Sequence, residues 1–350
     1  MNILFVIIGV SFLIFGHELG HFLSAKLFGV RVDEFGFGFP PRIFGKRMGE
    51  TLYSINALPF GGFVRIYGEG GASMEEGDTA RGFTQQSVWK RGIIMLAGVF
   101  MNFVIGWLFM SVVFMMGIPS HLGVLETAPN SPAAEAGIKT GDLIMEASYG
   151  GNTFSDPVRA EAFIALVHEA GTDEIDLTLN RAGERVSVAL RGRANPPEGE
   201  GSLGLGIADT GVPATPFLGS LVKGGEEVAG MTKMIAVGFV SLLGQAFTTP
   251  SVLREVAGPV GVVSIASKAS ELGFVYFLQF LALLSANLVV LNLLPFPALD
   301  GGKFLFLVYE KIRGKPASER VQIAVNIAGF ALLILLMIVV TIQDVTRLFH

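Results

Sequence analysis

The residues best suited to chemistry are His17, Glu18 and His21, close to the amino terminus. Histidines four residues apart project from one face of a helix, a spacing that suits two nitrogen ligands of a single zinc ion. The carboxylate beside them, Glu18, can take a proton from a water molecule as a general base. The spacing therefore predicts a zinc site with its own proton acceptor.

This cluster lies inside an apolar run, residues 2–28, that is long enough to cross a bilayer as a helix. Ionisable side chains at such a depth are costly unless they have partners. An accidental cluster would oppose membrane insertion, so its position favours a metal site over chance. The pattern H-E-x-x-H is typical of zinc peptidases.

The composition sets the class of protein. Of the 350 residues, 51% are hydrophobic and 16% are charged, which indicates several membrane spans and a folded soluble part. The chain has no cysteine, so any metal must be held by histidine and carboxylate ligands. The net charge of -5 does not indicate a nucleic-acid partner.

Residues 29–89, which follow the first span, are rich in glycine and phenylalanine and predict a β-hairpin region and a loop. Phe35, Phe37 and Phe39 alternate with glycines. These rings either close a small core or belong to a β-element that enters the membrane beside the first helix. In the second case, the edge of the β-element could pair with an extended substrate segment.

A second span is predicted over residues 90–118, and its Asn102 is expected to make an interhelical hydrogen bond. Residues 119–210 have the composition of a soluble domain, and they include alternating strand patterns at 175–179 and 186–190.

Within this domain, residues 128–144 (APNSPAAEAGIKTGDLI) resemble the signature of PDZ domains. Such a module binds an extended peptide beside a helix, with a loop of backbone amides around a terminal carboxylate. His168, on the expected helix, is interpreted as a surface residue. The candidate peptide-binding residues are Leu203, Gly204, Leu205 and Gly206.

The third span contains NLLPFPALDGG, whose prolines and aspartate predict a broken helix at membrane depth, tolerated only beside protein or water. Residues 226–247 are expected to lie on the membrane surface because charged side chains begin this helix. The last four predicted segments are interfacial helices at 211–271 with a turn at 258–261, the third span at 272–300, a cytoplasmic loop at 301–321 and a fourth span at 322–344.

Basic residues follow the first and third predicted spans, which places both of these segments in the cytoplasm by the positive-inside rule. The soluble domain then lies outside, and His17, His21 and Asp300 share the cytoplasmic side. They can meet as two imidazoles and one carboxylate around one zinc ion, with the fourth position open for water.

Together, HELGH at 17–21, GPVG at 258–261, NLLPFPALDG at 292–301 and the PDZ-like passage resemble the bacterial branch of the site-2 protease family, which are intramembrane zinc metalloproteases. The resemblance implies a polytopic α-helical membrane protein of about four spans, with a membrane-associated β-hairpin region. It also implies one extracytoplasmic α+β PDZ-like domain. The family's best-known enterobacterial member carries two PDZ domains in tandem, whereas this chain has room for one.

The resemblance also implies a reaction and its residues. One zinc ion per chain would be held by His17, His21 and Asp300, and Glu18 would be the general base. Substrates would be single-span proteins such as anti-sigma factors, or remnant signal peptides, cut in a bacterial cytoplasmic membrane. The implied substrate-binding residues are Asn287, Asn292, Pro295, Phe35 and Phe37.

Two other functions stay open at this point. A zinc transporter would also place histidine and aspartate in spans, although it would need several ligands along a path. An inert membrane scaffold would use the PDZ-like domain for partners and would have no need of Glu18 beside a ligand set.

Overall fold

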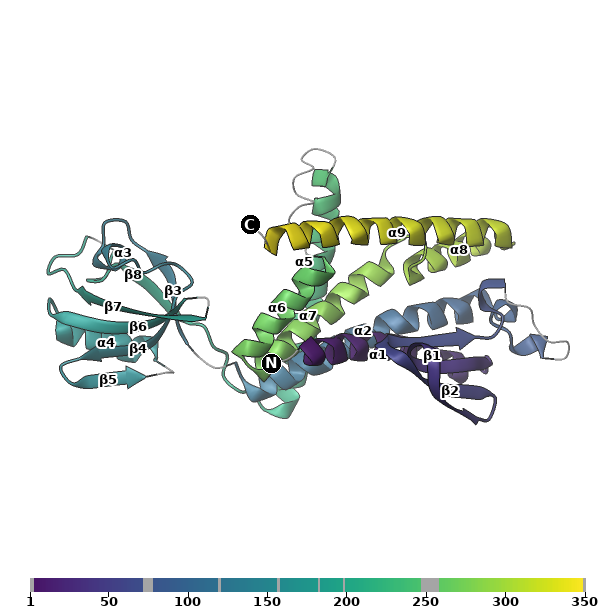
Figure 1. Cartoon of the computed structure of the whole chain (residues 1–350), viewed down its shortest axis with the longest axis horizontal. Coiled ribbons are helices and arrows are strands. Elements are labelled where there is room, and N and C mark those ends of the chain that lie inside the picture. Colours follow the sequence, from purple (N-terminus) through teal and green to yellow (C-terminus); the bar gives the residue numbers. More distant parts are fainter. Residues whose placement is uncertain are drawn as a thin grey trace. The chain divides into compact units, whose positions relative to one another are not determined.

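The computed structural model describes residues 3–71, 78–118, 121–155, 158–181, 183–197, 199–246 and 258–348. They form two units, residues 1–113 with 217–350, and residues 114–216. Among the described residues, the first unit contains seven α-helices and a β-hairpin (Figure 1). Its elements are α1 Ile3–Leu27, β1 Val32–Met48, β2 Thr51–Ile66, η1 Glu69–Gly71, η2 Thr79–Arg81, η3 Phe83–Gln85, α2 Val88–Met116, α5 Phe217–Ala246, α6 Pro259–Leu272, α7 Phe274–Leu293, α8 Asp300–Arg313 and α9 Glu319–Leu348.

Helices α1 and α2 approach each other closely because glycines lie between them. A Cβ atom on Gly20 would come within 2.3 Å of the Ala97 carbonyl oxygen, and one on Gly16 within 2.2 Å of the Ile105 side chain. Small residues allow helix backbones to approach in this way inside a membrane. The contact brings the side chains of α2 directly against His17 and His21.

Strands β1 and β2 form one long antiparallel pair, with Phe35 opposite Tyr53 and Met48 opposite Thr51. Part of β2 runs beside α1, because Ser11 donates to the Pro59 carbonyl at 2.6 Å. A Cβ atom on Gly61 would lie 2.6 Å from the Ile14 side chain, and one on Gly62 would lie 3.1 Å from the Phe15 ring, so α1 and β2 are in close contact. The predicted β-hairpin is thus present, and it lies against the first helix.

Phe35 and Phe37 both contact α1. Phe35 is 7% exposed and stacks on Phe22 with ring centroids 4.7 Å apart, while Phe37 meets Phe15 edge-on at 5.8 Å. The Phe35 ring is therefore buried against the helix, which agrees with the interpretation that these rings close a small core, while a contact with substrate stays a prediction.

Five of the described helices are long and apolar enough to cross a membrane, where about four spans were expected. The additional one is α5, which contains most of the segment 226–247 that was predicted to lie on the membrane surface; residue 247 lies outside the described residues. Figure 1 shows α5 running across the common direction of α1, α2 and α9, which is compatible with that prediction. Helix α5 qualifies as a membrane span only by its length and composition. Whether the protein has four or five spans therefore stays a prediction.

The chain between α7 and α9 differs from the expected loop. Helix α7 ends at Leu293, and a short turn that contains Pro295 and Pro297 follows it. Asp300 then begins α8, so a helix occupies much of the segment 301–321 that was predicted as a loop. Asn326 of α9 accepts a hydrogen bond from the Ala298 backbone at 3.2 Å, and Ala298 has a φ of 72°. Helix α9 therefore anchors the turn that presents Asp300.

The GPVG passage at 258–261 begins α6 with Gly258 as the N-cap residue and Pro259 in the first turn. The Gly258 and Gly261 amides donate to the Asp344 carboxylate of α9 at 3.1 and 2.8 Å. A distant carboxylate thus satisfies amides that a helix start leaves without an intrahelical partner.

The second unit is a sheet with two short helices. The strand order is β7-β6-β4-β3-β8, with β5 pairing to β4, and Phe163 and Leu166 of α4 pack over the sheet. Helix α4 and strand β8 flank a groove that includes Leu203, Leu205 and His168. A strand beside a helix fits the PDZ-like interpretation, which stays a prediction. The elements are β3 Leu122–Thr127, α3 Pro132–Glu135, β4 Leu143–Tyr149, β5 Asn152–Ser155, α4 Ala160–Ala170, β6 Glu174–Arg181, β7 Glu184–Arg191 and β8 Leu205–Asp209.

Candidate metal centre and active site

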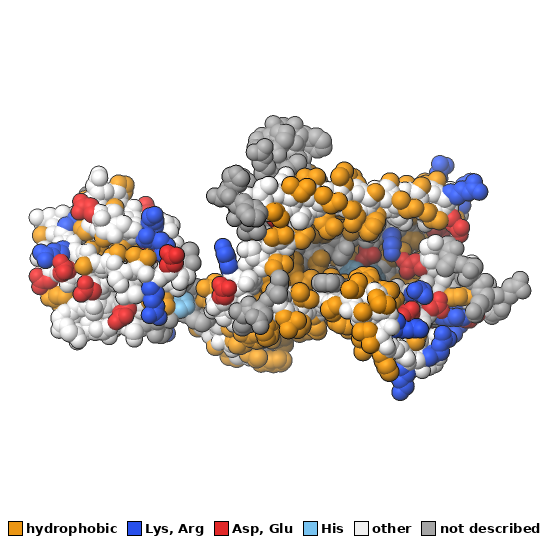
Figure 2. Space-filling view, viewed as in Figure 1, with side chains coloured by type: hydrophobic (Ala, Val, Ile, Leu, Met, Phe, Trp, Pro, Cys, Tyr) orange, Lys and Arg blue, Asp and Glu red, His pale blue; other side chains and the backbone are white. Residues whose placement is uncertain are grey.

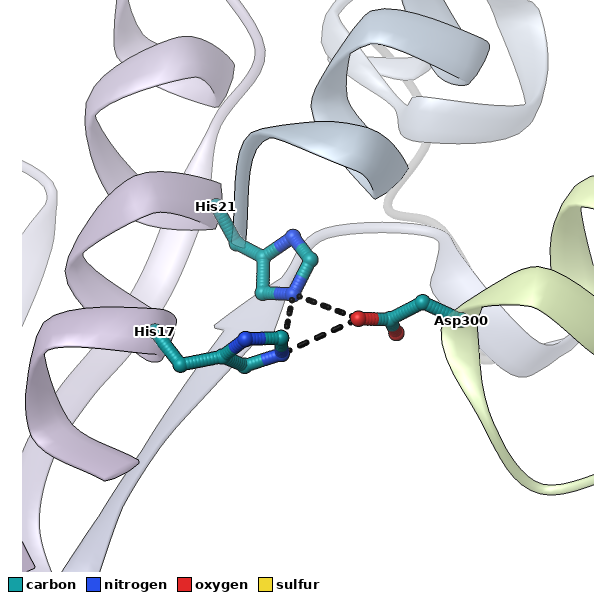
Figure 3. Close-up of side chains that lie close together, drawn as sticks. All are labelled: His17, His21 and Asp300. Carbon is teal, nitrogen blue, oxygen red and sulfur yellow. Dashed lines mark hydrogen bonds and ion pairs between the residues drawn. The ribbon is translucent and has the colours of Figure 1, made fainter. Parts of the chain in front are cut away.

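His17, His21 and Asp300 converge although Asp300 lies far from the histidines in the sequence (Figure 3). The His17 Nε2 atom is 3.0 Å from Asp300 Oδ2, His21 Nε2 is 3.3 Å from the same oxygen, and the two Nε2 atoms are 3.1 Å apart. Ligands bound to zinc at tetrahedral geometry lie roughly 3.3 Å from one another. The described residues contain this one group of three that could hold a metal ion, and its spacing fits zinc.

The space between these atoms is kept open by Gly98 of α2. A Cβ atom there would lie 2.4 Å from His21 Nε2 and 2.8 Å from His17 Nε2. Any larger residue would fill the place toward which the two ring nitrogens point. The chemistry of the donor set and this opening both fit a small cation.

Glu18 is oriented by the β-hairpin. Its Oε2 accepts a hydrogen bond from the Val64 backbone amide at 3.2 Å, so strand β2 reaches the predicted general base directly. Glu18, His21 and Asp300 line a small cavity of about 80 Å³. Figure 2 shows a hollow beside the apolar side chains of α9 in which a histidine, acidic side chains and a basic side chain are visible.

One cation, Lys303, lines the same cavity. Its Nζ donates to the Glu69 carboxylate at 2.8 Å, and this carboxylate raises the pKa of Lys303. Lys303 lies one helical turn after Asp300 on α8, so it adds positive charge near two carboxylates. Sequence analysis did not single out Lys303 or Glu69, and their separation by 234 residues explains why.

Asn287, Asn292 and Pro295, which were also predicted to bind substrate, do not line the cavity beside Glu18. Asn287 donates to the Leu283 carbonyl of its own helix at 3.0 Å. Pro295 instead lines an apolar cavity of about 750 Å³ between α8 and the start of α9.

Comparisons with known proteins decide the family. The pattern that defines Peptidase family M50 matches residues 5–336 of this chain. The chain belongs to peptidase family M50. Zinc metalloprotease RasP of Shouchella clausii is 31% identical over all of both chains. Regulator of sigma-W protease RasP of Bacillus subtilis is 30% identical over 96% of each, and zinc metalloprotease RasP of Geobacillus kaustophilus is 29% identical over 99% of this chain and 98% of its own.

Membership of family M50, the site-2 protease family, confirms the resemblance of the motifs. This M50 protein is a zinc metalloprotease, and its long apolar helices fit an integral membrane protein. The predicted zinc cofactor is likewise supported by the relatives and by the cluster of two histidines and one aspartate.

Proposed function

We propose that the protein is an endopeptidase that cuts peptide bonds in or near the transmembrane segments of single-span membrane proteins. The observation that carries this proposal is the convergence of Asp300, from α8, on His17 and His21, which lie with Glu18 in α1, a helix apolar enough to span a membrane. These three side chains would hold zinc, and Glu18 would be the general base.

Zinc bound there would polarise a peptide carbonyl and lower the pKa of a water molecule. The Glu18 carboxylate takes the proton from the attacking water and later delivers it to the leaving amine. Its hydrogen bond to the Val64 amide keeps one carboxylate oxygen fixed, which leaves the other free for that proton. Lys303 offsets part of the negative charge that Glu18, Asp300 and Glu69 bring to the cavity.

The substrate class is inferred from the surroundings of the site. A peptide bond inside a helix is shielded, so a membrane segment must unwind before hydrolysis. Strand β2 contacts Glu18 and lies beside α1. An extended substrate segment that pairs with the hairpin would therefore lie near Glu18, and Phe37, which packs on Phe15 of α1, would lie near that segment. We extend to this chain the substrates that the sequence predicted, namely anti-sigma factors or remnant signal peptides. The relative from Bacillus subtilis is named a regulator of sigma-W protease.

Further parts of the proposal concern location and selection. The protein would reside in a bacterial cytoplasmic membrane, with the active site toward the cytoplasm and the PDZ-like unit outside. Leu203, Gly204, Leu205 and Gly206 would help to bind peptide ends and admit trimmed substrates. Asn287, Asn292 and Pro295 would hold the unwound segment.

The experiment is cleavage of a model single-span substrate by purified protein in detergent, comparing wild type with Glu18→Gln. Zinc content is measured in both, and Glu174→Gln, on the surface of the second unit, is the control. Wild type and control should cut, while Glu18→Gln should keep about one zinc ion per chain, as one site of three ligands requires, and not cut. Zinc retention without cleavage in all three would contradict the protease mechanism and favour a scaffold.

A further inference from the structure

A side chain of α2 contacts the far side of the His17 ring. Asn102 is completely buried, and its amide nitrogen lies 3.2 Å from His17 Nδ1. The amide oxygen, also buried, has no hydrogen-bond partner among the described residues. This confirms that Asn102 makes an interhelical hydrogen bond, and the partner is one of the candidate zinc ligands.

The other histidine is held in a comparable way by the backbone of the same helix. His21 Nδ1 lies 2.8 Å from the Ile94 carbonyl oxygen. A carbonyl can only accept, so His21 Nδ1 carries the hydrogen; in the neutral ring, the form that binds a metal, Nε2 has none and faces Asp300. Ile94, Gly98 and Asn102 are each four residues apart and therefore lie on one face of α2.

For His17 the same tautomer requires an acceptor at Asn102. A histidine that binds a metal through Nε2 donates its Nδ1 hydrogen to a neighbouring oxygen, and this bond fixes the ring and raises its basicity. The nitrogen and oxygen of an amide have nearly the same shape, and which one faces a neighbour follows from the hydrogen-bond network. Turning the Asn102 amide places its oxygen toward His17 Nδ1 at the same separation.

We propose that Asn102 is a positioning residue that accepts the His17 Nδ1 hydrogen and thereby fixes His17 as a zinc ligand. Asn102 is not among the residues that line the cavity beside Glu18, so it acts through the ring and not on substrate. This inference rests on the proposed function, because it assumes that His17 binds zinc through Nε2.

The test measures zinc affinity by competition with a chelator, in a Glu18→Gln background so that proteolysis plays no part. Asn102→Asp keeps an acceptor and removes the donor, whereas Asn102→Leu keeps the approximate shape and removes both. Ser111→Ala is the control, because Ser111 is another buried polar residue of α2 and its hydroxyl donates to the Trp107 carbonyl of the same helix. Thermal unfolding of each variant reports folding.

We expect Asn102→Leu to bind zinc about 10- to 100-fold more weakly. Asn102→Asp should stay within a few fold of the background, and so should Ser111→Ala. Cobalt in place of zinc should give the same absorption spectrum in Asn102→Asp as in the background. Equal zinc affinity in Asn102→Leu, or weak binding in Asn102→Asp, would overturn the inference.

The Asp variant decides the question even if the Leu variant fails to fold, because a role as hydrogen-bond donor predicts loss of zinc on that change. Failure of the proposed function looks different. If the proposed function is wrong, neither wild type nor the Glu18→Gln background would bind zinc as tightly as a structural or catalytic site does.

Discussion

Replacing Gly98 by alanine tests the geometry of the metal centre most directly. The new Cβ atom would lie 2.4 Å from His21 Nε2, 2.7 Å from His17 Cε1 and 2.8 Å from His17 Nε2. Carbon atoms in contact need about 3.5 Å, so a ring or the helix must move by roughly 1 Å. A displacement of that size at a catalytic group costs roughly 100-fold in rate.

The assay is the rate of cleavage of a single-span substrate, with zinc content and thermal unfolding measured on the same preparations. Gly106→Ala is the matched control, since its Cβ would lie 3.3 Å from the Ser285 Cβ and away from both rings. We expect Gly98→Ala to lose about two orders of magnitude in kcat/KM and part of its zinc, and Gly106→Ala to lose far less. If Gly98→Ala kept both rate and zinc, the metal would not lie where the three ligand atoms meet.

Three further changes probe the surroundings. Lys303→Met removes the cation that faces Glu69, so the cavity becomes more negative. The cleavage rate should fall about tenfold, which corresponds to about 1.4 kcal/mol, while zinc is retained. A rate equal to wild type would show that Lys303 has no electrostatic role. Asn326→Leu removes the acceptor for the Ala298 amide and should weaken zinc binding in a chelator competition, because the turn before Asp300 loses its anchor; unchanged affinity would contradict this anchoring. Asp142 accepts two hydrogen bonds from Arg181, which lower its pKa. Because the folded-state pKa lies below the unfolded value near 4, this pair stabilises the fold above about pH 4 and the contribution is lost as the pH falls. Asp142→Asn should therefore cost about 2 kcal/mol of unfolding free energy at pH 7, and the difference from wild type, followed by thermal unfolding, should shrink toward pH 3; a difference that does not vary with pH would refute the linkage.

The sequence was enough to suggest His17, Glu18 and His21 as a candidate site because the information in their spacing is local. Two histidines at helical spacing inside an apolar run need no tertiary structure to suggest a metal. Asp300 could be added because prolines near it predict a break in a membrane helix, and the distribution of basic residues puts that break on the same side. Membership of family M50 agrees with this reasoning.

The supporting residues could not be predicted, because they depend on how helices face each other. Gly98 is one of 45 glycines, and nothing in its neighbourhood marks it as the residue opposite the imidazoles. Residues 301–321 were interpreted as a cytoplasmic loop because basic residues follow the third predicted span. In the structure, Gly301 and Gly302 are needed there because a Cβ atom would collide with the Leu293, Leu294 and Phe296 backbones.

The distribution of the ligands along the chain has a consequence for biosynthesis. A nascent chain in the membrane carries both imidazoles as soon as α1 has been inserted, but it has no carboxylate partner until Asp300 leaves the ribosome. The proposed metal centre is therefore incomplete while α2, the second unit and α5 to α7 are made. The order of synthesis alone therefore keeps the proposed hydrolytic centre from assembling before α8 is made.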